Sequence, residues 1–105
     1  MIIESLKELF TRDLKRLKSE IELYEDESTM WKVENSIKNS GGNLCLHLIG
    51  NLKTFIGNGI DQIGYERDRE FEFAGKNVSR ETLLTGIDET IHILDSALSL
   101  SLIHI

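Results

Sequence analysis

A polar stripe runs through an otherwise apolar segment of the sequence, residues 41–57, which reads GGNLCLHLIGNLKTFIG. Asn43, His47 and Asn51 are four residues apart, so on a helix their side chains lie one above the other. Neutral imidazole is a common ligand of zinc and nickel, and helical bundles hold metals with side chains from facing helices. A single histidine on such a helix is more often a hydrogen-bonded core residue, so the residues alone leave both roles of His47 open.

The single cysteine and the two other histidines give weaker evidence of a functional role. Cys45 is two residues from His47, about 200° around a helix, so the two cannot act as nucleophile and base, and we expect Cys45 to be buried as a small apolar residue. His92 follows a predicted core position and is expected at the surface or at the edge of a groove. His104 belongs to an atypical C-terminal stretch and carries less weight.

A charged segment downstream alternates acids with arginines: Glu66, Arg67, Asp68, Arg69, Glu70 and Glu72. Solvated ion pairing is the expected state of these side chains, and no two carboxylates stand out as general acid and base. The sequence contains no glycine-rich phosphate loop, no CxxC pair and no HExxH motif. The catalytic residues and the cofactor-binding residues, if any, therefore stay unknown at this point.

Composition excludes several partners. The 105 residues carry a formal net charge of -6 with a pI near 5.0, which argues against a nucleic-acid or anionic-membrane surface. The basic residues between 12 and 18 are interrupted by Asp13 and fit a solvated helix face. A single cysteine permits no intrachain disulfide, and we expect a reducing cytoplasmic setting. Neither a signal peptide nor a transmembrane span is visible.

Hydrophobic periodicity predicts an all-α fold. Apolar residues recur at three- and four-residue steps over 2–24 and 79–100, and they cover nearly every side of a helix over 43–60, so we predict three helices. Asn43 is expected to cap the second helix or to lie in its first turn, and Trp31 to anchor the preceding connector in the core. Ser79 is expected to open the third helix, with Glu81 in its positive first turn.

Two segments fall outside this pattern. Residues 58–78 are predicted to form an ordered loop that crosses the bundle, with Tyr65, Phe71 and Phe73 as its apolar anchors. A short hairpin over 70–73 is the competing interpretation. Residues 99–105 lose the charged face of the earlier helices and end in bare apolar residues, which we interpret as a truncation or an unnatural tail.

Three motifs together resemble a known family. The stretches NSGGNLCLHLIGNLKTFIG, GYERDREFEF and KNVSRE, in this order, resemble the bacterial DinB-like, YfiT-like superfamily of metal-dependent enzymes, and the resemblance covers nearly all of residues 1–98. It implies a four-helix bundle, often dimeric, in which three histidines bind a divalent metal such as nickel or zinc. One of these is on the second helix and matches His47; the other two form an HxxxH pair on the last helix. Relatives include S-transferases that use low-molecular-weight thiols.

The sequence departs from this family in one respect, since no HxxxH occurs in the 105 residues. We therefore expect residues 1–98 to be an incomplete DinB-like domain: an antiparallel bundle with three of the four helices, followed by an atypical tail at 99–105. The parent would be a metal-dependent thiol S-transferase or a hydrolase of unknown substrate, and this chain would be inactive alone. An apolar groove left along the second and third helices would favour a homodimer or other self-association. A non-catalytic helical interaction module is the alternative.

Overall fold

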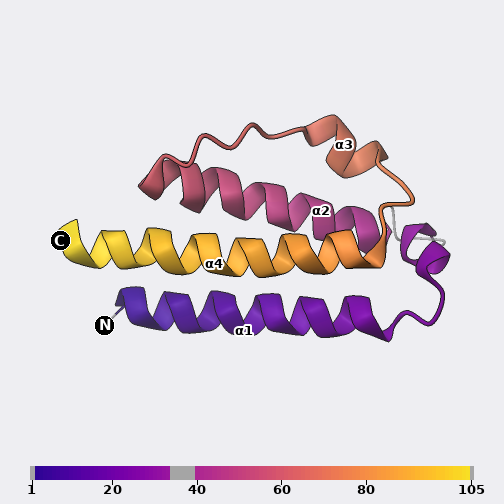
Figure 1. Cartoon of the computed structure of the whole chain (residues 1–105), viewed down its shortest axis with the longest axis horizontal. Coiled ribbons are helices and arrows are strands. Elements are labelled where there is room, and N and C mark those ends of the chain that lie inside the picture. The colour runs from indigo at the N-terminus through magenta and orange to yellow at the C-terminus, as the bar shows by residue number, and fades with distance from the viewer. Residues whose placement is uncertain (1, 34–39, 105) are drawn as a thin grey trace.

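The computed structural model describes residues 2–33 and 40–104, and it describes their side chains except at Phe73 and at 101–104. Figure 1 shows the long helices lying side by side, with shorter helical segments at one end and above them. In chain order the elements are α1 (Ile2–Leu23), the short 3-10 helix η1 (Glu27–Trp31), α2 (Gly41–Leu52), its π-helical continuation η2 (Lys53–Asp61), α3 (Arg69–Ala74) and α4 (Arg80–His104).

Helix α1 matches the first predicted helix and packs against α4 in the opposite direction. Its apolar stripe buries Leu14 and Ile21. Two ion pairs fix the direction, because Lys7 lies 3.1 Å from Asp95 whereas Lys18 lies 3.0 Å from Asp88. The residue number rises along one helix as it falls along the other, so the two helices are antiparallel and both termini lie at one end (Figure 1).

Helix α2 begins earlier than expected. Ser40 is its N-cap, since the Ser40 hydroxyl accepts a hydrogen bond of 3.1 Å from the Asn43 N–H. Asn43 is accordingly a first-turn residue, one of the two predicted roles. The buried Trp31 ring lies against Gly42, where a Cβ would come within 2.8 Å of it, which confirms Trp31 as an anchor. The helix continues through η2 and ends at Gln62, whose φ of 50° is left-handed.

Helices α2 and α4 run in the same direction. Close approaches between them join Gly86 to Ile49 and Ile93 to Gly57, and Lys53 Nζ lies 3.2 Å from Glu89 Oε1 between those points. Residue numbers rise together along the two helices, so this pair is parallel. The cause is the connection after η2, which returns along α2 before α4 starts (Figure 1). The antiparallel prediction therefore holds for α1 against its two neighbours and is wrong for α2 and α4. The return connection runs back along α2 instead of crossing the bundle (Figure 1).

The return connection contains a helix that the sequence analysis did not predict. Asp68 accepts a 3.0 Å hydrogen bond from the Phe71 N–H and caps α3, while Glu70 lies in the positive first turn. The hairpin interpretation of 70–73 is thus wrong, and the count of three helices misses this short one. Tyr65 is half-buried as expected, but Phe71 is exposed and does not anchor the segment. The Phe73 side chain lies outside the described residues.

Helix α4 starts as predicted and ends later. The Ser79 hydroxyl accepts a 3.1 Å hydrogen bond from the Thr82 N–H, and Glu81 is in the first turn. The helical backbone extends to His104, four residues past the expected end, so the predicted tail begins inside the helix rather than after it. Side chains from 101 onward, including that of His104, lie outside the described residues.

One apolar core joins the three long helices and η1. Its buried members are Leu14, Ile21, Met30, Trp31, Cys45, Ile49, Leu83, Ile87 and Leu94. The all-α class is confirmed, because residues 2–33 and 40–104 contain helices and connections but no strand. In the part of the chain that the structure describes, no helix combines the length and the apolarity that crossing a bilayer would require.

Candidate functional site

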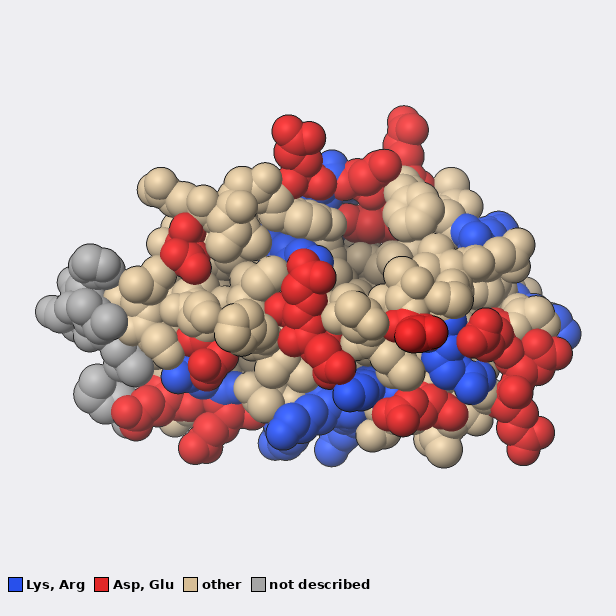
Figure 2. Space-filling model, viewed as in Figure 1, with Lys and Arg blue, Asp and Glu red and all other residues tan. Residues whose placement is uncertain are grey.

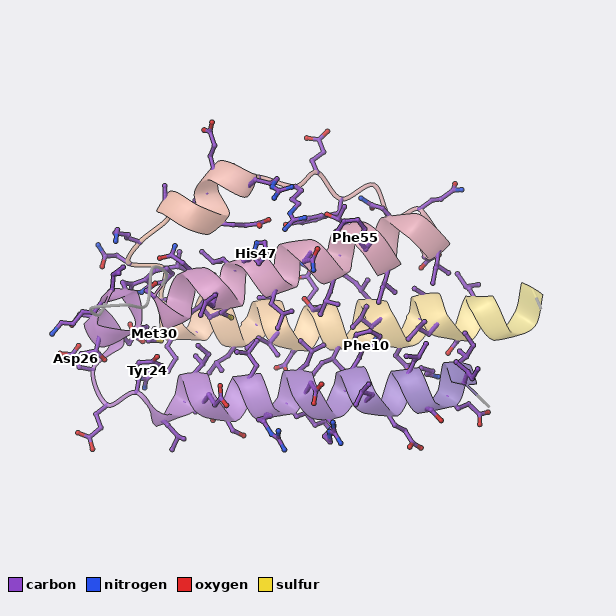
Figure 3. The ribbon with its side chains drawn as sticks, turned by 180° about the vertical axis from the view of Figure 1, so that it is seen from behind. Phe10, Tyr24, Asp26, Met30, His47 and Phe55 are labelled. Carbon is purple, nitrogen blue, oxygen red and sulfur yellow. The ribbon has the colours of Figure 1, made fainter. Side chains whose placement is uncertain are left out.

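His47 lies on the face of α2 that looks toward α3 (Figure 3). Its Nδ1 is 3.2 Å from Oε1 of Glu72, a residue of α3. The Glu72 side chain is only 4% exposed, whereas that of His47 is 37% exposed. The pair therefore consists of a buried carboxylate and a partly exposed imidazole.

Arg67 holds the buried carboxylate from the other side. Its Nε donates to Glu72 Oε2 at 2.9 Å and its Nη2 donates to Glu72 Oε1 at 3.0 Å, a bidentate pairing. The hydrogen bonds to Glu72 raise the pKa of Arg67. The same Nη2 is 3.3 Å from His47 Nδ1, so guanidinium and imidazole converge on Oε1. A carboxylate this buried needs such partners, because an unpaired buried charge is strongly unfavourable.

Asn43 fixes the end of α3 on α2. Its side-chain amide donates to the backbone carbonyls of Glu72, at 3.1 Å, and of Gly75, at 2.7 Å. Its carbonyl oxygen accepts a 2.6 Å hydrogen bond from the Ser40 hydroxyl. These carbonyls belong to the last turn of α3 and just beyond it, where helices lack internal donors. The polar stripe thus has a structural role at Asn43, and Asn51 lies half-buried one turn beyond His47.

Gly50 provides the space that the carboxylate occupies. A Cβ built on Gly50 would lie 2.0 Å from Glu72 Oε2. Sequence reasoning placed Glu72 among solvated carboxylates, which is wrong: this residue is buried, while Glu66, Asp68 and Glu70 are exposed. A glycine three residues after His47, inside an apolar helix, is the signal that could have revealed a side chain approaching this face.

A second polar contact lies one turn further along. Lys53 Nζ is 5.2 Å from the centre of the Tyr65 ring, within cation–π range, and also pairs with Glu89. The Asn58 side chain holds the Tyr65 backbone through hydrogen bonds of 2.8 and 2.9 Å. Burial, and next the nearby Glu72 charge, raise the pKa of Tyr65. Lys53, Tyr65 and the Arg67–Glu72 pair therefore form one continuous polar layer between α2 and the return connection.

The remaining candidates are separate from this layer. Cys45 is fully buried in the core, and burial raises the pKa of its thiol to about 12, so it is the inert cysteine that was predicted. His92 is exposed on α4, which confirms its assignment to the surface. The structure therefore brings His47 together with Glu72 and Arg67, and leaves both Cys45 and His92 apart.

The residues around His47 do not make a complete metal site. Within residues 2–33 and 40–104, as far as side chains are described, no three histidine, cysteine, aspartate or glutamate residues are placed to hold one ion. Glu72 is already bound by Arg67, whose positive charge lies beside Nδ1. A catalytic metal needs about three protein ligands, and the described side chains form no such set around His47.

Comparisons of this chain with protein-family models, with curated proteins and with solved structures find no match. The DinB-like resemblance therefore rests on the three sequence motifs.

Proposed function

We propose that this chain is the N-terminal part of a DinB-like metal-binding bundle protein in which His47 is one metal ligand. The observation that carries the proposal is the 3.2 Å contact between His47 Nδ1 and the buried Glu72 carboxylate. Metal-binding histidines commonly donate one ring N–H to a carboxylate, which fixes the ring orientation and makes the imidazole a better ligand. The other ligands would come from an HxxxH helix beyond the 105 residues, and the metal would be nickel or zinc.

The reaction class follows from the resemblance alone. A parent of this family would be a thiol-dependent S-transferase or a hydrolase, and a low-molecular-weight thiol would be its cosubstrate. Since the described residues do not complete the metal site, we derive no catalytic step from them. For this chain the proposal predicts weak metal binding and no activity alone.

Calorimetric titration with Ni²⁺ tests the proposal on two proteins: the present chain, and a longer chain that continues its reading frame through an HxxxH helix. We expect the present chain to bind no better than an ordinary surface histidine, and the longer chain to bind tightly. His47→Ala should abolish tight binding, whereas the control His92→Ala, which removes an exposed imidazole, should leave it intact. Tight binding by the 105 residues alone, or by the longer His47→Ala variant, would contradict the assignment.

A non-catalytic interaction module is the second candidate, and the bidentate Arg67–Glu72 pair favours it. These side chains and Asn43 form contacts that stabilise the bundle without any ligand. On this hypothesis the reading frame holds no downstream HxxxH. His47→Ala would then lower the unfolding midpoint by the same amount with and without a chelator. A midpoint that rises on adding Ni²⁺ to the longer wild-type chain, but not to its His47→Ala variant, would exclude this candidate.

A further inference from the structure

The Asn58 side chain, near the end of η2, holds the start of the return connection. Its Nδ2 donates to the Tyr65 carbonyl at 2.8 Å, and its Oδ1 accepts a hydrogen bond of 2.9 Å from the Tyr65 N–H. These two bonds close the turn in which the chain reverses after η2 (Figure 1). Only a side-chain amide serves both Tyr65 groups, because it offers a donor and an acceptor at once.

Asn58 is also the one asparagine of the sequence that precedes a glycine, Gly59. This pair favours deamidation, because glycine adds no side chain to obstruct ring closure and its backbone rotates freely. The Gly59 nitrogen attacks Asn58 Cγ and forms a C–N bond, while the side-chain nitrogen takes up the Gly59 N–H proton and leaves as ammonia. Water then opens the cyclic imide to aspartate or isoaspartate. The reaction needs no partner other than water.

The folded structure opposes this reaction through hydrogen bonds and not through crowding. The Asn58 carbonyl accepts a 3.2 Å hydrogen bond from the Gln62 N–H, and ring closure requires a rotation that breaks this helix end. Gly59 is exposed, as Figure 2 shows for many uncharged residues, and nothing lies within 4 Å of a Cβ built on it. Residues 62–68 form neither helix nor strand and are mostly exposed, which is typical of segments that open locally. Deamidation therefore has to wait until the return connection detaches.

We propose that Asn58 is a deamidation site controlled by the return connection: detachment permits the reaction, and the product keeps the connection detached. The new carboxylate has no donor for the Tyr65 carbonyl, so two acceptors face each other. It also places a negative charge in the last turn of η2, where the helix dipole disfavours one. The released segment carries Tyr65 and Arg67, so their contacts with Lys53 and Glu72 loosen as well.

Peptide mapping by mass spectrometry tests the site and its control by the fold, in mildly alkaline buffer with and without guanidinium chloride. We expect Asn58 to deamidate about tenfold more slowly in the folded chain than in the unfolded one, because only open molecules react. Gly59→Ala should slow the reaction in both states, and Asn51, which precedes Leu52, is the internal reference. Equal rates in the folded and unfolded chain, or no product at Asn58 in the unfolded chain, would overturn the proposal.

Limited trypsin digestion tests the effect of the product. Asn58→Asp places aspartate at the site directly, and cleavage after Arg69 should become about five- to tenfold faster, because more molecules have the connection open. Gln62→Glu, which adds the same charge at an exposed residue, is the control and should be cleaved at the wild-type rate. Wild-type chain that has deamidated on storage, separated by ion exchange, should match Asn58→Asp and repeats the test without a substitution. Cleavage of either aspartate form at the wild-type rate would overturn the proposal.

Discussion

The contacts that α1 makes with α4 differ in kind from those that α3 makes with α2. The first pair meets through buried apolar side chains such as Leu14, Ile21 and Ile87, and its ion pairs are peripheral. The second pair is joined by directional contacts, from the Asn43 amide to the Glu72 backbone carbonyl and between His47 Nδ1 and the Glu72 carboxylate. Apolar burial tolerates small shifts, whereas a hydrogen-bond network fails when one member is lost. The packing of the long helices therefore depends on the amount of apolar surface that they bury. The position of α3 depends on the placement of a few hydrogen-bonding atoms.

The largest effect on stability is expected from a substitution in the apolar core. Ile87→Ala leaves a cavity in the core and should lower the free energy of unfolding by about 2–5 kcal/mol. Ile87 is fully buried in the core that joins the long helices. Urea denaturation followed by circular dichroism measures the change. The matched control is Leu44→Ala on α2, since Leu44 is half exposed, and it should stay within about 0.5 kcal/mol of the wild type. Equal losses in the two variants would mean that this core is not the main source of stability.

A smaller effect is expected at the polar contact. Gly50→Ala should favour the helix by about 1 kcal/mol from propensity alone. Its Cβ would nevertheless lie 2.0 Å from Glu72 Oε2, so the carboxylate must move. We expect a net destabilisation of about 1–3 kcal/mol, because overpacking costs more than the propensity gains. Trypsin cleavage after Arg69 should also become faster as α3 detaches.

Gly59→Ala is the control for this experiment. It has nothing within 4 Å of a built Cβ and lies in the same continuous helical segment. It should leave cleavage after Arg69 unchanged and leave stability equal or slightly higher. If Gly50→Ala behaves in the same way, the buried position of Glu72 is wrong.

The smallest effect is expected in the pH dependence of stability, through the exposed Asp26 side chain. Asp26 caps η1, and the hydrogen bonds from the Ser28 N–H and hydroxyl lower the pKa of Asp26 below its ordinary 3.8. A lowered folded-state pKa stabilises the protein above pH 3.8 and loses that contribution as the pH falls through the folded value. Asp26→Asn should therefore be less stable than wild type near neutral pH and equal to it in strong acid. Thermal melts between pH 2 and 6 measure this; a constant difference would exclude the carboxylate as its cause.

Much of the fold could be predicted from periodicity. The apolar steps of α1 and α4 predict both helices to within a few residues, because long amphipathic helices have a strong local signal. The α3 helix was missed because its six residues are mostly charged or aromatic, and its cap, Asp68, looks like any loop aspartate. Local β propensity suggested a hairpin over 70–73. The contacts that Asn43 makes with the backbone of this segment favour the α3 helix instead.

The candidate site was predicted only in part. His47 was identified from its position on an apolar helix, and the burial of Cys45 from its neighbours. The sequence does not distinguish Glu72 from Glu66, Asp68 and Glu70, because all four acids have charged or aromatic neighbours in the same segment. Their difference in burial arises because Glu72 alone points at Gly50, and that approach depends on the path of the whole return connection.

By itself the sequence determined the helical class, the three long helices and the isolation of a single histidine in the apolar part of α2, because these properties depend on neighbours within a few residues. Only the tertiary structure decided that α2 and α4 run parallel and that Glu72 and Arg67 reach His47. Each of these depends on which residues distant in sequence come within a few ångströms of one another, and no local pattern encodes those distances.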